Sequence, residues 1–301
     1  MRVPPCRGIS SRCSRRVFLA RTSLAAAGLA ASCGERSTAW AAPIVFTTRL
    51  ATRARVRPDL LDKDSAPGIE VVQLTAEPDV RSSHLYMEAQ IFTMDSKRFV
   101  LHRSATAHGG SQSDPQHQYL LCDLENDCAL SPLTSETGVT GASVSPDGKY
   151  VYYFVNETKL NGGRLTLKRV NLDGSDRQTL IVVDAPLVGT SSCPSRIYPL
   201  STISSDGQRL AISAFLADSY REGAPFGLLV FDLVKGTVSV PIQWPTWCNM
   251  HPQYCRSLDP EAAHDILIQE NHGNELGPDG SIKKLTGDRK STRLNSSHVS
   301  E

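Results

Sequence analysis

Hydrophobic and polar residues alternate along most of the chain from Gly68 onward, in short runs that end at turn signals. The runs are rich in β-branched and aromatic residues, as in Tyr150 to Val155 and Leu210 to Phe215, and this composition favours strands. The turn signals recur at intervals of 52, 59 and 53 residues, centred on Asp95, Asp147, Asp206 and Asp259. A recurring period of this size indicates a repeat architecture.

Each repeat also carries a second hairpin. Leu165 to Val170 and Gln178 to Val183 flank an Asp-Gly turn, and in the next repeat Leu228 to Phe231 and Thr237 to Val240 flank Gly236. Four antiparallel strands per repeat, with almost no helical periodicity, predict an all-β fold built from the blades of a β-propeller. A two-sheet sandwich has similar strand spacing, but it does not repeat one turn chemistry on a fixed period.

The repeats are too few for a closed propeller. Gly68 to Thr75 (GIEVVQLT) is predicted to be a single outer strand that completes the last blade, and three full repeats and the first half of a fourth follow it. An open set of blades leaves two sheet faces uncovered. We therefore expect residues 68–286 to form an incomplete propeller, from a parent that we expect to have seven blades.

Two segments flank this region. Residues 43–67, rich in Arg, Asp and Pro, are predicted to be a poorly structured lead-in. At the other end the alternation stops after Leu285, and the polar run RKSTRLNSSHVSE (Arg289 to Glu301) resembles translated sequencing-adaptor sequence. We expect residues 287–301 to be a non-native disordered tail; a native disordered tail would have the same composition.

Residues 1–42 have the features of an export signal. Basic residues precede an Ala/Leu-rich run that is too short to span a bilayer as a mature helix, and Ala39-Trp40-Ala41 offers a cleavage site. Ser14-Arg15-Arg16-Val17-Phe18-Leu19 resembles a signal for the twin-arginine (Tat) export machinery. Cys33 as a lipoprotein cysteine is the alternative. The predicted location is the bacterial periplasm or the cell exterior, with no membrane span.

The net charge and the cysteine content of the chain indicate which kinds of partner and which disulfides to expect. The net charge of +1 argues against nucleic acid as the main partner, but it leaves open a local basic cleft for an acidic substrate. After cleavage five cysteines remain. In an oxidising compartment their spacing suits disulfides between Cys122 and Cys128 and between Cys248 and Cys255, which would leave Cys193 unpaired.

Candidate chemistry is concentrated between Trp247 and Gly273, WCNMHPQYCRSLDPEAAHDILIQENHG. His251 falls where the innermost strand of a blade begins, so its side chain can face the central channel. His251 and Gln253 at alternate positions of one strand offer nitrogen and oxygen ligands that suit Mn²⁺ or Mg²⁺. A zinc site of Cys248, His251 and Cys255 is an alternative, as is a purely structural role for His251.

Three further residues are candidates for substrate binding. His84 and Tyr86 open the innermost strand of the first blade, so they are expected to face the same channel as His251. Tyr86 could equally pack between blades. His272 ends the second strand of its blade, where a surface loop position is the alternative.

Two resemblances extend these predictions. The Ser/Asp-Gly hairpins resemble TolB-like propeller repeats. SHLYMEAQIFTMDSKRFVL (residues 83–101) and MHPQYCRSLDPEAAHDILIQENHG (residues 250–273) resemble segments of oligogalacturonate lyases, seven-bladed propellers that cleave short pectic fragments. The resemblance implies a Mn²⁺-type ion held by three histidines and a glutamine, of which the first histidine is similar to His251. The other ligands would lie beyond the point where the foreign tail begins.

The lyase resemblance also implies a mechanism and a substrate. An oligogalacturonide or another acidic oligosaccharide would be cleaved by metal-assisted β-elimination, and Arg196 would be the base, although a surface salt bridge is its alternative role. We expect the fragment alone to be inactive. The alternative function is a non-catalytic TolB-like periplasmic propeller that serves as a binding or scaffold module.

Overall fold

Antiparallel strands make up almost all the regular structure of this protein. The computed structural model describes residues 54–75, 81–86, 88–104, 117–159, 162–190, 193–219, 223–245, 247–271, 275–276, 282–284 and 289–295. Those ranges contain one short 3-10 helix, Pro58–Leu60, and no α-helix. The prediction of an all-β fold is confirmed.

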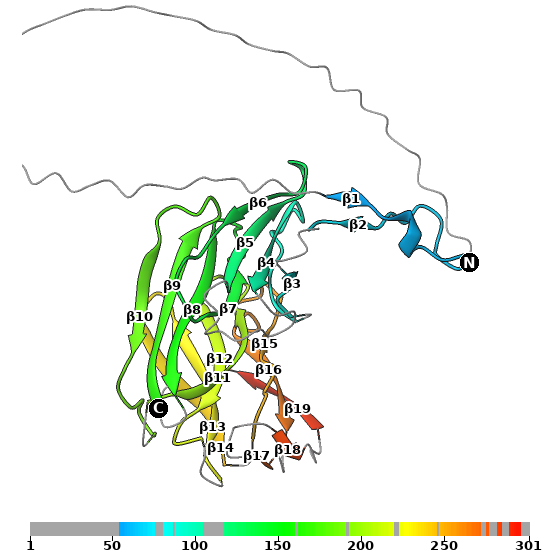
Figure 1. Cartoon of the computed structure of the whole chain (residues 1–301). Helices are drawn as coiled ribbons and strands as arrows, with labels where there is room; N and C mark the ends of the chain where they lie inside the picture. The colour runs from blue at the N-terminus through cyan, green and yellow to red at the C-terminus, as the bar shows by residue number, and fades with distance from the viewer. Residues whose placement is uncertain are drawn as a thin grey trace, which may run out of the picture. The chain divides into compact units, whose positions relative to one another are not determined.

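Three four-stranded antiparallel sheets follow one another along the chain, and Figure 1 labels their strands. In each sheet the strands lie in sequence order, so every connection is a hairpin. The first blade has β3 (Arg81–His84), β4 (Arg98–Ser104), β5 (Gln118–Asp123) and β6 (Ala129–Pro132). The second has β7 (Val139–Val144), β8 (Tyr150–Lys159), β9 (Gly162–Asn171) and β10 (Gln178–Val183). The third has β11 (Ser195–Ile203), β12 (Arg209–Phe215), β13 (Phe226–Asp232) and β14 (Thr237–Trp244).

The fourth sheet is smaller and includes part of the C-terminal tail. It pairs β15 (Gln253–Tyr254) with β16 (Asp265–Asn271), and β16 with β19 (Arg289–Asn295). The sequence pattern predicted no strand in residues 289–295. Backbone pairing does not depend on side-chain alternation, so the open edge of β16 accepts this polar segment as a partner. β17 (Glu275–Leu276) and β18 (Ile282–Lys284) form a separate two-stranded ribbon.

The described part of the N-terminal lead-in, residues 54–67, contains a short strand and the 3-10 helix, where the composition predicted little structure. β1 (Arg55–Val56) pairs with β2 (Val72–Gln73) in a two-stranded ribbon, and the Arg57 and Asp59 side chains form an ion pair at 2.6 Å. The outer strand predicted over residues 68–75 is thus reduced to β2, which pairs with β1 and not with a blade. Arginine side chains reinforce this pairing, because Arg55 Nε donates to Gln73 Oε1 at 3.3 Å.

The first turn of each complete blade repeats one set of hydrogen bonds. A hydroxyl two residues before the aspartate donates to its carboxylate, from Thr93 to Asp95 at 2.6 Å and from Ser145 to Asp147 at 2.6 Å. In the third blade Ser204 donates to Asp206 at 2.5 Å. These carboxylates also accept backbone N–H groups two residues later. The recurring aspartates are therefore turn-forming residues.

Hydrophobic cores lie between consecutive blades. One core joins the first and second blades, through Val100 and Tyr119 on one side and Val151 and Tyr153 on the other. A second core joins the second and third blades, where the Phe154 and Phe231 rings meet edge to face with centroids 5.1 Å apart. A third core packs β13 of the third blade against Trp247, Met250 and β16. Consecutive blades thus bury their facing sheet surfaces against each other, as the blades of a propeller do.

Among the described residues, Cys122 and Cys128 do not form the disulfide that their spacing suits, and neither do Cys248 and Cys255. Cys122 is fully buried in β5, and its Sγ donates to the carbonyl oxygen of Cys128 at 3.7 Å. Burial raises the pKa of Cys122 to about 12, with smaller contributions from Cys128 and Asp123. A buried, protonated thiol is a poor nucleophile for disulfide exchange.

Gln90 joins the first blade to the third. Its side-chain amide donates to the Ile203 carbonyl at 2.8 Å and accepts the Ile203 N–H at 2.5 Å, as a neighbouring strand would. Its own carbonyl accepts the Val144 N–H of the second blade at 2.7 Å. Gln90 is buried, so water does not replace these bonds.

We expect Gln90→Leu to lower the free energy of unfolding by about 1–3 kcal/mol, because both backbone groups of Ile203 lose their partner in a buried place. Urea denaturation measures the change. Gln243→Leu is the matched control, since Gln243 makes an exposed bond to the Gly189 carbonyl, and we expect it to change stability by less than about 0.5 kcal/mol. Equal effects of the two variants would contradict the role of Gln90.

Glu136 anchors the connection between the first two blades. Its Oε1 accepts from Lys168 Nζ at 2.7 Å and from the Tyr153 hydroxyl at 3.0 Å. Burial alone would raise the pKa of this carboxyl group, but the Lys168 hydrogen bond, backbone N–H groups and the Arg177 charge together hold it below the usual value.

A lowered carboxyl pKa stabilises the folded state above the pKa of the unfolded chain, and this contribution is lost as pH falls through the folded-state pKa. We therefore expect Glu136→Gln to be less stable than the wild type at pH 7, with the difference shrinking below about pH 4.5. Thermal unfolding from pH 3 to pH 7 tests this. A difference that does not change with pH would mean that ionised Glu136 is not the stabilising group.

Candidate functional site

The connection between β14 and β15 presents His251 through an unusual backbone. Met250 is fully buried, and its carbonyl accepts the Gln269 N–H at 2.6 Å, which fixes the connection against β16. The residues on either side of it, Asn249 and His251, have positive φ values of 51° and 45°. Such values are uncommon outside glycine and concentrate at functional positions. The buried methionine thus holds His251 in a conformation that a free chain would disfavour.

Four residues from three parts of the chain meet at His251, and we call them the His251 cluster: Tyr86, Glu88, Tyr198 and His251. His251 Nδ1 lies 2.7 Å from Glu88 Oε2, and His251 Nε2 lies 3.3 Å from the Tyr198 hydroxyl. The rings of Tyr86 and Tyr198 lie 5.7 Å and 5.1 Å from the imidazole, centroid to centroid. Tyr86 and Glu88 follow β3, and Tyr198 is on β11. The cluster therefore spans the first, third and fourth blades.

The hydrogen bonds define the roles of the two imidazole nitrogens. A carboxylate only accepts hydrogen bonds, so a neutral imidazole that faces one through Nδ1 would carry its proton there and keep a lone pair on Nε2. Tyr198 can donate to that lone pair, because burial, followed by a hydrogen bond with Tyr86, raises the pKa of its hydroxyl and keeps it protonated. Both side chains of the Glu88–His251 pair are partly exposed, at 27% and 19%. The cluster is accessible to a ligand.

Arg196 lies on β11, two residues before Tyr198 of this cluster. It is the extra residue of a β-bulge in β11, with φ 33°, while its neighbour Ile197 packs into the core between the second and third blades. Arg196 and Tyr198 flank Ile197 in the sequence, and both are half-buried. Arg196 Nη1 is buried without a hydrogen-bond partner among the described residues, an arrangement that is costly unless a ligand pairs with it.

The other predicted site residues are less closely associated. Gln253 is half-buried on β15, opposite Leu267. His251 precedes that strand with a left-handed backbone, so strand alternation does not align it with Gln253 as expected. His84 ends β3, is exposed, and lies outside the His251 cluster as defined. His272 lies outside the described residues.

The zinc alternative gains no support. Cys248 is buried, and burial raises its pKa to about 11, which disfavours the thiolate that zinc binds. Cys255 Sγ accepts the Ser257 N–H at 3.4 Å. Among the described residues no group of three His, Cys, Asp or Glu side chains is arranged to hold a metal ion.

Glu88 and Tyr198 were not predicted as site residues. No local pattern marked either residue: Glu88 lies in a turn in which the Ala89 N–H donates to the Tyr86 carbonyl, and Tyr198 follows a β-bulge. What the sequence lacked was the pairing across blades, since Glu88 and His251 are 163 residues apart.

His251 and its surroundings partly fit a metal ligand. A histidine that binds a metal through one nitrogen commonly donates the other N–H to a carboxylate, which is the arrangement of His251 and Glu88. The Nε2 bond to Tyr198 is long enough to be replaced. His251 thus fits as one ligand, and the described residues do not complete a donor set around it.

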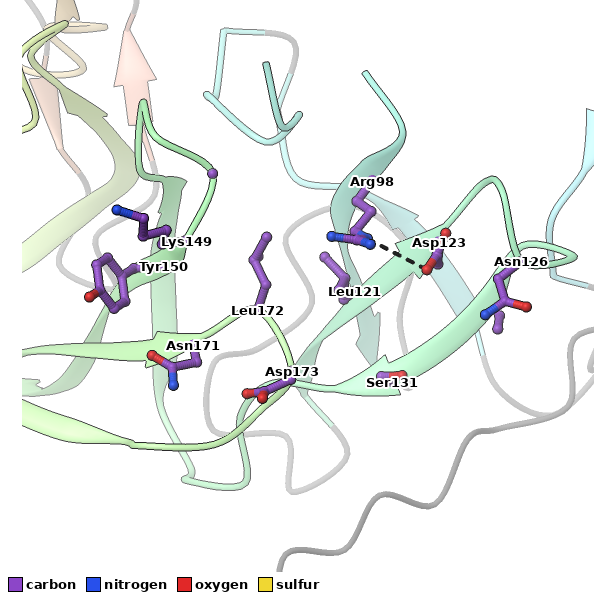
Figure 2. Close-up of a pocket in the computed structure, with 12 residues that line it drawn as sticks. Arg98, Leu121, Asp123, Asn126, Ser131, Lys149, Tyr150, Asn171, Leu172 and Asp173 are labelled. Atoms are coloured by element: carbon purple, nitrogen blue, oxygen red, sulfur yellow. Dashed lines mark ion pairs between the residues drawn. The ribbon is translucent and has the colours of Figure 1, made fainter. Parts of the chain in front are cut away.

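A pocket of about 770 Å³ lies elsewhere, between the first two blades. Figure 2 shows Arg98 and Asp123, paired at 3.5 Å, on one side and Lys149, Tyr150 and Asp173 on the other. Its polar groups are largely engaged in turns, for example Lys149 with Asp147 at 3.1 Å. The His251 cluster is not part of its lining, so we place the candidate chemistry at the cluster and not at the pocket.

Within the part of the chain that the structure describes, we find no helix with the length and hydropathy needed to cross a membrane. The segment predicted to direct export, residues 1–42, lies outside the described residues.

Comparison with known proteins supports the fold. No protein-family model and no curated protein matches the sequence. Among solved structures the chain is similar to an oligogalacturonate lyase from Vibrio parahaemolyticus, with 20% identity and a TM-score of 0.54 over 78% of this chain and 60% of the lyase. It is equally similar to an oligogalacturonate lyase in complex with manganese, with 20% identity and a TM-score of 0.54 over 80% of this chain and 61% of that one.

A weaker similarity is to TolB from Acinetobacter baumannii, with 18% identity and a TM-score of 0.42 over 71% of this chain and 45% of TolB. The chain spans about three fifths of the length of the two lyases. At these identities the similarity to the two lyases establishes the fold alone: the described sheets are blades of a β-propeller, three of them four-stranded and one smaller.

Proposed function

We propose that this chain is part of an oligogalacturonate lyase-like enzyme that cleaves short acidic oligosaccharides by β-elimination. The observation that carries the proposal is the His251 cluster, in which a carboxylate-bound imidazole and two tyrosines converge from three blades. The lyases with a similar fold support the choice of reaction. Activity belongs to the complete propeller, because the chain spans only three fifths of those proteins.

β-Elimination from a uronate determines which chemical groups the site must supply. In a uronate the proton next to the carboxylate is removed, a carbon–carbon double bond forms, and the glycosidic oxygen at the β position leaves. A divalent cation, Mn²⁺ in this proposal, would neutralise the carboxylate and stabilise the charge that develops. His251 Nε2 would hold it together with ligands from the rest of the propeller, and Gln253 on β15, which strand alternation does not align with His251, is the candidate for a second ligand.

The remaining residues orient the substrate and move protons. Arg196 is the candidate base, and its unpaired Nη1 supports an interaction with an anionic sugar. To act as the base, Arg196 must first lose a proton, and guanidinium groups remain charged in nearly all proteins. Tyr86, His84 and His272 are candidates for contacts with the sugar. The proposal also includes export to the periplasm through the Tat machinery, with residues 1–42 as the signal.

The experiment uses the full-length protein that contains this region, with Mn²⁺ and digalacturonate, and follows the ultraviolet absorbance of the unsaturated uronate. We expect His251→Ala to lower kcat/KM by about 100-fold or more, since removing one such group typically costs this much. Removal of the metal with a chelator is expected to abolish the signal.

His264→Ala is the matched control. His264 pairs with Asp206 at 2.7 Å, outside the His251 cluster, so its loss is expected to leave kcat/KM within about twofold. If the folded, Mn²⁺-saturated protein forms no product, the lyase proposal fails. The non-catalytic TolB-like binding module is then the better reading.

A further inference from the structure

The segment from Tyr86 to Gln90 connects the blades at the His251 cluster. Tyr86 and Glu88 both contact His251, whereas Gln90 contacts the second and third blades. Glu88 forms a hydrogen bond with His251, which lies beside the fourth blade. The Gln90 side chain forms hydrogen bonds with the N–H and the carbonyl of Ile203 in the third blade. The Gln90 carbonyl bonds Val144 in the second blade. Gln90 is buried and makes three hydrogen bonds to neighbouring blades. These bonds restrict the backbone two residues from Glu88 and so help to hold the Glu88 side chain in place.

His251 needs an external support of this kind. It lies before β15 and not within it, so no strand ladder orients it. Its backbone is left-handed, and the described hydrogen bonds to its ring come from Glu88 and Tyr198. The Glu88 contact, at 2.7 Å, is the shorter of the two by 0.6 Å, as is typical of a charge-assisted hydrogen bond.

We propose that Glu88 is a positioning residue that holds His251 in the Nδ1–H tautomer and directs the Nε2 lone pair toward the ligand. The use of that lone pair for a metal rests on the proposed function, but the tautomer does not. Tyr198 has a different part: it occupies Nε2 when no ligand is bound and gives way when one binds.

The first test reads the tautomer directly in this chain by nitrogen NMR of labelled histidines at about pH 8.5, where ordinary imidazoles are neutral. His251→Gln assigns the resonance among the eight histidines. We expect His251 to carry its proton on Nδ1. His264 is an internal reference of opposite kind, because its Nε2, and not its Nδ1, faces the carboxylate of Asp206.

Two variants separate positioning from general stability. Glu88→Ala is expected to shift His251 toward a mixture of tautomers and to leave His264 unchanged. Glu88→Gln is expected to restore the Nδ1–H form, since a Gln oxygen can still accept from Nδ1. A wild-type His251 protonated on Nε2, or an unchanged tautomer in a folded Glu88→Ala protein, overturns the proposal.

The second test measures Mn²⁺ affinity by titration calorimetry on the full-length protein. Loss of a carboxylate partner of a metal-ligating histidine typically weakens binding 10- to 100-fold, and we expect about this for Glu88→Ala. Tyr198→Phe is expected to bind Mn²⁺ at least as tightly as the wild type. Equal losses in both variants would contradict the distinct roles.

The two tests separate the two proposals. A Glu88-dependent tautomer in a protein with no lyase activity supports the positioning role and rejects the lyase. An active lyase whose His251 tautomer ignores Glu88 rejects the positioning role alone.

Discussion

The structure depends on burial of sheet faces between consecutive blades. A four-stranded antiparallel sheet has two faces, and here each complete blade presents large side chains that only the next blade can cover, such as Phe154 against Phe231. This burial is the main favourable term in folding. It also fixes how the inner strands approach one another, and that approach brings Glu88, Tyr198 and His251 within hydrogen-bonding distance.

Hydrogen bonds between the inner strands fix how the blades align once hydrophobic burial has brought them together. Ser143 and Ser201 share a hydrogen bond at 2.7 Å, and Thr202 accepts the Tyr254 N–H at 3.0 Å. Gln90 is the most demanding case, because its amide takes the place of a neighbouring strand. These bonds give each interface a single register, which a hydrophobic core alone would not specify.

The blades could be predicted from the sequence because their signals are local. The prediction for Gln178 to Val183 coincides with β10, and the hydroxyl–aspartate turns explain why the repeats were visible. The site was predictable only in part. His251 stood out by composition, but Glu88 and Tyr198 join it through contacts that no local pattern encodes. β19 was missed because main-chain pairing needs no particular side chains.

The distance in sequence between Glu88 and His251 has a consequence for folding. Joining residues 163 positions apart closes a very long loop, and such contacts form slowly because the chain must first be ordered in between. The three complete blades supply that order one hairpin at a time. We therefore expect the imidazole to acquire its carboxylate partner late in folding, after the hairpins of the complete blades have formed.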